Sequence, residues 1–173
     1  MGRKKYSGLT RKAGTRTVWN GVIREDPKAQ SIPFGWKKPR KIFVNSMSDL
    51  FHDDVSDEFI LSVWKVMRKT PHHNYQILTK RPERMAALVA DRIGEILPNV
   101  WLGTSIENAD VVRRVDYLRQ APAAIRFISF EPLIGSVGAV DLHDVHWAIV
   151  GGQSGSRRDR SKRNGSMRST TNA

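Results

Sequence analysis

The sequence predicts an α/β fold built on a parallel β-sheet, and three observations carry this prediction. Short apolar segments recur along the chain, with their ends 22 to 34 residues apart. Amphipathic helical patterns fill three of the four intervals between these segments. Each apolar segment also runs into small or polar residues. Strands that alternate with helices in this way are typical of βα units, whose crossover connections make neighbouring strands parallel.

Five segments are predicted to be strands because they are short apolar runs bounded by polar residues, Gly or Pro. They are 42–44, 75–78, 100–102, 125–128 and 147–150. The chain ahead of them, 1–40, is irregular and rich in Gly, Pro and basic residues. It holds one further strand candidate, 17–23, and its aromatic residues Trp19, Phe34 and Trp36 indicate packing against the rest of the protein.

Three helices are predicted in the intervals between the strands. The first covers 56–69, with Ser56 as its N-cap and apolar residues spaced three and four apart. The second begins at Pro82, since proline is favoured in the first turn of a helix. The third begins at Asn108, a residue that also suits a helix cap. The last interval, 131–146, contains a proline and two glycines, so we expect a loop there.

The distribution of charge divides the chain into three parts. The net charge is +12 over 173 residues, a length that suits one domain with a hydrophobic core. Residues 1–16 hold six basic residues and no acid, and 156–173 hold six basic residues and one acid. The intervening 17–155 is nearly neutral, with 17 basic and 16 acidic residues. We expect a basic N-terminal arm (1–16), a single α/β domain (17–155) and a disordered basic tail (156–173), since the tail has no Leu, Ile, Val or aromatic residue.

The composition excludes several classes of protein. No apolar run approaches the ~20 residues of a membrane helix, and no apolar segment follows the basic N-terminus as in a secretory signal. We therefore expect a cytoplasmic protein with no membrane partner. The chain has no cysteine, which removes disulfides, thiolate zinc sites and cysteine-bound iron–sulfur clusters from these residues. The five histidines form no metal or catalytic motif, so we predict no metal site.

Polar residues follow all five expected strands, and this pattern predicts a binding site. The carboxyl ends of parallel strands meet at one edge of a sheet, and ligands bind there in parallel α/β folds. We select two catalytic candidates, Asp49 and Glu131. The candidates for binding a cofactor are Asn45, Ser46, Thr79, Lys80, Arg81, Thr104, Ser105, Glu107, Ser129, Gly151 and Gly152.

Some of these residues also have plainer interpretations. Lys80 and Arg81 suit a phosphate or carboxylate, although a basic pair is often only a solvated surface. Glu131 stands between a strand and a proline, outside any helix face, which favours a role as acid, base or polar anchor. The glycines of 151–155 would let backbone N–H groups approach a ligand, but no helix pattern follows them as in a phosphate loop.

Seven short motifs connect the chain to a known family. In order they are YSGLT (6–10), WKKPR (36–40), FVNSMSDLFH (43–52), ILTKRP (77–82), NVWLGTS (99–105), FEPL (130–133) and GG (151–152). With these motifs the sequence resembles the phage gene product 37 / gene product 68 family, whose members are similar to radical S-adenosylmethionine (SAM) enzymes. The resemblance implies a TIM-like (β/α) barrel, complete or partial. We expect an incomplete barrel here, and the composition of the basic termini predicts that they are disordered.

The resemblance also implies chemistry for intact family members. They would use a [4Fe–4S] cluster held by an upstream group of cysteines, which binds SAM and cleaves it to a radical. In such a protein Lys80 and Arg81 would hold an anionic group, and Ser105 and Glu107 would bond a ribose or amino group. The chain has no cysteine, starts inside the family's pattern and loses its hydrophobic residues abruptly after Gly155. We therefore expect it to be a fragment truncated at both ends, with no cofactor of its own and inactive alone.

Two other functions stay open at this stage. The chain would be a non-catalytic nucleic-acid-binding protein if the basic arm 1–16 and tail 156–173 supplied phosphate contacts. It would be a metal-free enzyme if Glu131 acted as an acid or base without a cofactor. Whether the chain is an enzyme, its substrate and its oligomeric state are not predicted.

Overall fold

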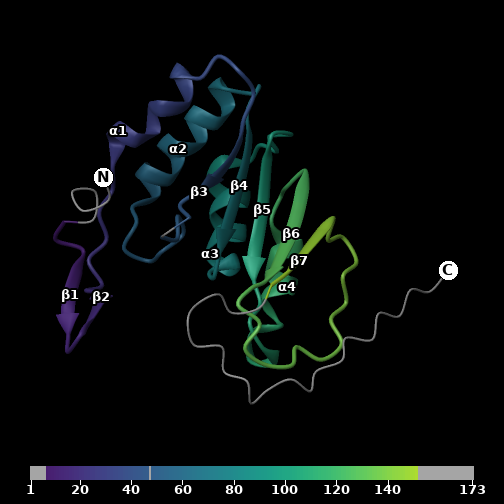
Figure 1. Ribbon diagram of the computed structural model, residues 1–173. Helices are drawn as coiled ribbons and strands as arrows, with labels where there is room; N and C mark the ends of the chain where they lie inside the picture. The colour runs from purple at the N-terminus through teal and green to yellow at the C-terminus, as the bar shows by residue number, and fades with distance from the viewer. Residues whose placement is uncertain (1–6, 47, 152–173) are drawn as a thin grey trace.

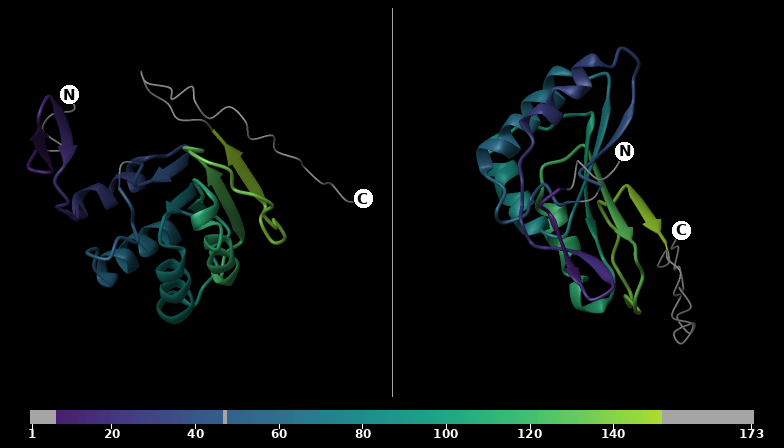
Figure 2. Two further views of the ribbon diagram at one scale, coloured as in Figure 1. Left: turned by 90° about the horizontal axis from the view of Figure 1, so that it is seen from below. Right: turned by 60° about the vertical axis from the view of Figure 1, so that its left-hand side comes forward.

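The computed structural model of the protein describes residues 7–46 and 48–151. It is a mixed α/β structure in which a five-stranded parallel sheet carries helices on one side (Figure 1). A small antiparallel hairpin near the N-terminus lies apart from this sheet in both Figure 1 and Figure 2.

The sheet confirms the five predicted strands and their parallel pairing. Each strand pairs with the next one along the chain, so the spatial order equals the chain order. Three strands run further than predicted, into residues that we had placed after their ends. The strands are β3 (Lys41–Val44), β4 (Asn74–Thr79), β5 (Val100–Ser105), β6 (Ile125–Phe130) and β7 (Trp147–Val150).

Two of the three predicted helices form largely as expected. Helix α2 (Asp57–Lys69) is capped by Ser56, whose hydroxyl accepts from Phe59 N at 3.2 Å. Helix α3 (Pro82–Leu88) begins at Pro82 and continues as a π-helical turn, η2 (Val89–Ile93). The segment 131–146 holds no helix, as predicted.

The third predicted helix is broken in two. Asn108 caps a 3-10 turn, η3 (Ala109–Val111), and its side chain accepts from Asp110 N at 3.1 Å. The α-helix, α4 (Arg114–Gln120), begins only after this turn. The short helices α1 (Pro27–Gln30) and η1 (Ile32–Gly35) were not predicted, since four residues are too few to show a periodic pattern.

The hydrophobic core lies between the sheet and its helices. Figure 2 shows α2, α3 and α4 on the same side of the sheet. From the strands, Ile77, Leu102 and Ile128 point to this side and are at most 1% exposed. They pack in one cluster with fully buried helix residues such as Ile60 and Leu118. Each such side chain contributes about 1.5–3 kcal/mol on burial, so this layer stabilises the packing of the helices on the sheet.

The opposite face of the sheet, called here the open face, has no covering helix among the described residues (Figure 2). It carries a small aromatic group. Phe127 lies against β5 because Gly103 has no side chain, and a Cβ there would stand 2.5 Å from Phe127 Cζ. The centre of the Trp147 ring lies 5.8 Å from the centre of the Phe127 ring. It lies 6.0 Å from the centre of the Trp101 ring, which it meets edge-on.

The sheet does not close into a barrel within 7–46 and 48–151. Both outer strands, β3 and β7, pair on one side only in this part of the chain. The structure therefore supports the α/β class and the parallel βα repeats, with all strands in chain order and the larger helices on one side.

The N-terminal arm differs from our expectation for it. Part of 1–16 was expected to be disordered, yet β1 (Thr10–Ala13) and β2 (Arg16–Trp19) form an antiparallel hairpin around Gly14, which has a φ of +60°. The strand expected at 17–23 is therefore shorter and starts earlier. Sequence reasoning missed β1 because nearly all its side chains are polar and exposed, so no apolar alternation marks it.

The predicted tail, 156–173, lies outside the described residues. Among the helices that the structure describes, none combines the length and the apolar character needed to cross a membrane.

Candidate functional site

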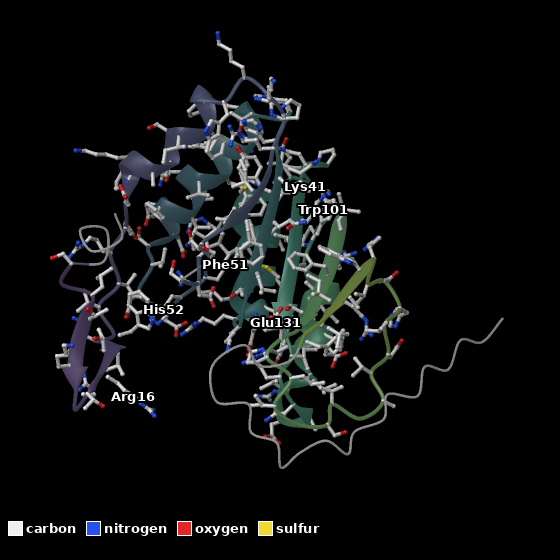
Figure 3. The ribbon with its side chains drawn as sticks, in the orientation of Figure 1. Arg16, Lys41, Phe51, His52, Trp101 and Glu131 are labelled. Carbon is white, nitrogen blue, oxygen red and sulfur yellow. The ribbon has the colours of Figure 1, made fainter. Side chains whose placement is uncertain are left out.

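The predicted site residues gather at the carboxyl edge of the sheet, because the five strands are parallel. Figure 3 shows Glu131 toward this edge, with Lys41 and Trp101 toward the amino end. The structure divides the candidates into two groups, because neighbouring residues of a strand point to opposite faces. One group faces the helices and the other belongs to the open face.

Asp49 organises the group on the helix side. Its Oδ1 accepts from Phe51 N at 3.0 Å and from Thr79 Oγ1 at 2.7 Å. Its Oδ2 accepts from Lys80 N at 3.0 Å and from Arg81 Nη1 at 3.2 Å. A carboxylate has about four acceptor positions, so these bonds occupy all of them. The geometry therefore makes Asp49 an anchor that joins the loop after β3 to the end of β4, with no free lone pair for proton transfer.

The two threonine candidates also belong to the helix side and are already bonded. Thr79 and Thr104 are 2% and 0% exposed. Thr104 Oγ1 donates to Thr79 O at 2.9 Å, and Thr79 Oγ1 accepts from Arg81 N at 2.9 Å. These bonds hold the ends of β4 and β5 together. We call Asp49, Thr79, Arg81 and Thr104 the anchor cluster.

Glu107 is a buried carboxylate held between two cations. It is 8% exposed. Its Oε1 lies 2.5 Å from Lys80 Nζ, and its Oε2 lies 2.9 Å from Arg114 Nη1. Burial raises the pKa of Glu107, but the hydrogen bond and charge of Lys80 and the charge of Arg114 together lower this pKa below its usual value. Glu107 is therefore ionised at neutral pH. Lys80 remains half in solvent, with 58% of its side chain exposed, so it can also reach a ligand.

Sequence reasoning missed Arg114, which fixes this part of the site. Besides Glu107, it donates to Ser105 O at 2.8 Å and so ties α4 to the end of β5. An arginine in the first turn of a helix carries no signal of its own in one sequence. Its role depends on the approach of α4 to β5, which only the tertiary structure reveals.

The open-face group consists of Ser105, Ser129, Glu131 and Gly151, called here the open-face cluster. Ser105 and Ser129 are paired in register on neighbouring strands and are 4% and 5% exposed. Neither hydroxyl has a hydrogen-bond partner among the described residues. Glu131 follows two residues after Ser129, so alternation places it on the same face, and it is exposed. Its carboxylate likewise has no polar partner within the described part of the chain.

Gly151 leaves the space that Glu131 occupies. A Cβ at this position would stand 2.8 Å from the carboxyl carbon of Glu131 and 3.0 Å from both its oxygens. The Gly151 backbone is fixed, since its N donates to Phe130 O at 3.3 Å and its O accepts from Leu133 N at 3.1 Å. Glycine at 151 therefore lets the Glu131 carboxylate lie against the end of β7.

The remaining candidates lie at the margin of the site. Asn45 and Ser46 follow β3 and are exposed, and Asn45 adopts a left-handed backbone with a φ of 59°. Asparagine tolerates this conformation better than most residues, which fits the tight turn closed by the bond from Ser48 N to Asn45 O at 3.1 Å. Gly152 lies outside the described residues.

An open groove of about 480 Å³ borders the anchor cluster on the helix side. Its charged side chains include Arg114 and two further arginines, Arg84 and Arg113, that sequence reasoning did not select. Arg84 is committed to structure, because it donates to Val55 O and Asp57 Oδ1 at 2.7 and 2.8 Å. The groove is lined by Asp53, Lys80, Arg81, Pro82, Glu83, Arg84, Ala87, Asp110, Val111, Arg113, Arg114 and Tyr117.

The described residues contain no group of three or more His, Asp or Glu side chains placed to hold a metal ion. An iron–sulfur cluster needs thiolate ligands, and the 173 residues include none. The donor set of this chain therefore does not fit such a cluster. Hydroxyls, a free carboxylate and an exposed ammonium instead suit an organic ligand with several polar groups.

Comparison with known proteins gives a family for the chain. The family model described as "Protein of unknown function (DUF5131)" matches residues 1–170. No curated protein and no solved structure matches the chain.

Proposed function

We propose that this chain, which belongs to the DUF5131 family, binds a nucleoside-type ligand such as SAM at the carboxyl edge of its sheet. One observation carries the proposal. The open-face cluster places two hydroxyls and a carboxylate, all without polar partners among the described residues, on one face at the edge where parallel folds bind ligands. Ser105 and Ser129 are nearly buried residues and Glu131 is exposed, so their free oxygens can form hydrogen bonds with a ligand at this edge.

The chemistry of the cluster suits such a ligand. Glu131 would accept hydrogen bonds from ribose hydroxyls or from an ammonium group. Ser105 and Ser129 would each donate or accept one bond. Lys80 would pair with an anionic group, because its ammonium is exposed and Glu107 is shared with Arg114. An acid or base role for Glu131 also belongs to this proposal, whereas Asp49 does not, because its acceptor positions are filled.

We further propose that the chain is a radical-SAM-like protein that does not cleave SAM alone. Its seven motifs support the likeness, and the absence of cysteine from its 173 residues supports the second part. Radical chemistry would require a [4Fe–4S] cluster from elsewhere, and no step through such a cluster is assigned to these residues.

Isothermal titration calorimetry with SAM and with S-adenosylhomocysteine tests the binding proposal. We expect Glu131→Gln to weaken binding about tenfold or more, since a hydrogen bond to a charged group contributes about 1.5–3 kcal/mol. The matched control is Glu58→Gln, which changes an exposed glutamate on α2. If neither compound binds the wild type, or if Glu131→Gln binds equally well, the proposal is wrong.

Iron reconstitution tests the second part independently. We expect no broad visible absorption when iron and sulfide are added to the purified chain. A stable chromophore with cleavage of SAM would contradict the statement that the chain lacks this activity, while leaving ligand binding intact.

Nucleic-acid binding through the basic termini is a second candidate function. The described part of the arm favours it, because Arg11, Lys12 and Arg16 are exposed on the hairpin and form no ion pair with a described carboxylate. Replacing these three residues by serine should weaken oligonucleotide binding if the arm supplies the contacts. Unchanged binding would exclude the arm.

A further inference from the structure

A run of basic residues leads into β3 at the amino end of the sheet. Lys37, Lys38, Arg40 and Lys41 are all exposed. None of the four forms an ion pair with a carboxylate in the described part of the chain. The cations at the carboxyl edge behave differently, since Lys80 and Arg114 each contact Glu107. We call 37–41 the basic edge.

The basic edge is ordered. Arg40 N donates to His73 Nδ1 at 3.2 Å, and Arg40 O accepts from Asn74 N at 2.8 Å. The Arg40 guanidinium lies 4.5 Å from the centre of the Trp36 ring, and His72 Nε2 donates to Trp36 O at 3.2 Å. These contacts fix the backbone of the run against the sheet, so its charges are presented from a defined surface.

No acid offsets this charge at the neighbouring strand starts. The connections that enter β4, β5 and β6 at this end, residues 70–74, 97–99 and 121–124, contain no Asp or Glu. Four cations with no Asp or Glu in these connections repel one another. A bound polyanion neutralises them and so relieves this repulsion, and its condensed counterions are released at the same time.

Aromatic and amide side chains continue from the basic edge across the open face. Lys41 is paired in register with Asn74, and the next row joins Phe43 to Gln76 and Gln76 to Trp101. Phe43 is 44% exposed. Figure 3 shows both Lys41 and Trp101 toward this end of the sheet. Aromatic rings stack on any base, and amides bond base edges, so this row suits unpaired bases.

We propose that the basic edge and the adjoining row of the open face bind single-stranded nucleic acid. Phosphates lie on Lys37, Lys38 and Lys41, and a base stacks on Phe43. An acidic protein segment would satisfy the cations but leave the exposed aromatic ring unused, so the single strand accounts for more of the surface. The site is at the opposite end of the strands from the open-face cluster and does not depend on ligand binding there.

Fluorescence anisotropy of a labelled oligouridylate of about 15 nucleotides tests the proposal with the full chain. We expect Lys38→Ala/Lys41→Ala to weaken binding at least tenfold in about 0.1 M salt and to reduce the slope of log K against log salt by about 1.4. The matched control is Lys65→Ala/Lys69→Ala, which removes the same charge from exposed positions on α2. This control should change affinity by less than about twofold, and it should change the salt slope far less than Lys38→Ala/Lys41→Ala does.

Phe43→Ala tests the stacking contact separately. We expect about a tenfold loss of affinity with the salt slope unchanged, because stacking releases no counterions. Ile96→Ala, at another exposed apolar side chain, should have no effect. Circular dichroism melts verify that all variants remain folded.

Several outcomes would overturn the proposal. The proposal is wrong if the wild type does not bind the oligouridylate, or if the double lysine variant binds it as well as the wild type does. It is also wrong if binding is lost only when the basic residues of 156–173 are replaced by serine. Equal binding of a duplex of the same length together with no effect of Phe43→Ala would contradict it, and so would binding of an acidic peptide without binding of the oligouridylate.

Discussion

The two ends of the same sheet use charge in opposite ways. At the carboxyl edge three cations are matched to carboxylates, in the contacts of Arg81 with Asp49 and of Lys80 and Arg114 with Glu107. At the amino end, the four cations of the basic edge have no such partner among the described residues. Paired charges fix the geometry of a site, whereas unpaired charges are available to a partner. The charges at the carboxyl edge therefore hold side chains in a fixed geometry, whereas those at the amino end are available to a polyanion.

The largest effect is expected for Asp49→Ala, at the paired end. The change leaves Thr79 Oγ1, two backbone N–H groups and Arg81 Nη1 without this acceptor. Breaking a partly buried charged network of this kind costs about 3 kcal/mol. Urea unfolding should show this loss, while Asp54→Ala, at an exposed residue of the same loop, should change stability little. Equal effects of the two variants would show that the anchor cluster is not a structural tie.

The next largest effect is expected at Gly103, which lies on the open face of the sheet. Gly103→Ala forces the buried Phe127 ring to move, because the new Cβ would stand 2.5 Å from it. Overpacking of this kind costs about 1–3 kcal/mol. Gly35→Ala is the control, since a Cβ there meets no atom within 4 Å. A thermal melt with equal midpoints for both variants would mean that Phe127 repacks freely.

A smaller effect is expected from pH at the paired end. The pKa of Glu107 is lowered in the folded protein, so its contribution is present above the ordinary glutamate pKa of about 4.3 and is lost as pH falls through the folded value. Between about pH 5 and pH 3 the wild type should therefore lose more stability than Glu107→Gln. Parallel pH profiles in urea unfolding would contradict the clamp between Lys80 and Arg114.

The smallest effect is expected at the unpaired end. Lys38→Ala/Lys41→Ala removes no ion pair with a described carboxylate, so the free energy of unfolding should change by less than about 0.5 kcal/mol. Circular dichroism melts check this. A large destabilisation would show that these lysines support the fold, which would remove the contrast between the two ends.

The sequence predicted the fold better than the site. All five sheet strands were located because each contains a run of apolar residues. The carboxyl ends of three strands were placed too early because the prediction ended them where the apolar run ends, whereas Thr79, Thr104, Ser105 and Ser129 continue the strands. The buried Thr104 hydroxyl is tolerated there because Thr79 O on the neighbouring strand accepts its hydrogen bond.

The division of the candidate site could not be predicted from the sequence. Thr104 and Ser105 are adjacent, yet one bonds on the helix side and the other belongs to the open face. Which face a residue takes depends on the true end of its strand and on the side that the helices cover. Arg114 was missed for a related reason, since its contact with Glu107 depends on how α4 approaches β5.

The two outer strands give the sheet one blocked edge and one extendable edge. On β3, Pro39 and Lys41 stand at the strand's start, and charged residues and proline are what discourage another strand from pairing. On β7, Trp147–Val150 contains no charge and no proline, and Trp147 and Val150 are 42% and 56% exposed. An additional strand, from the same chain or another, would therefore pair with β7 and not with β3.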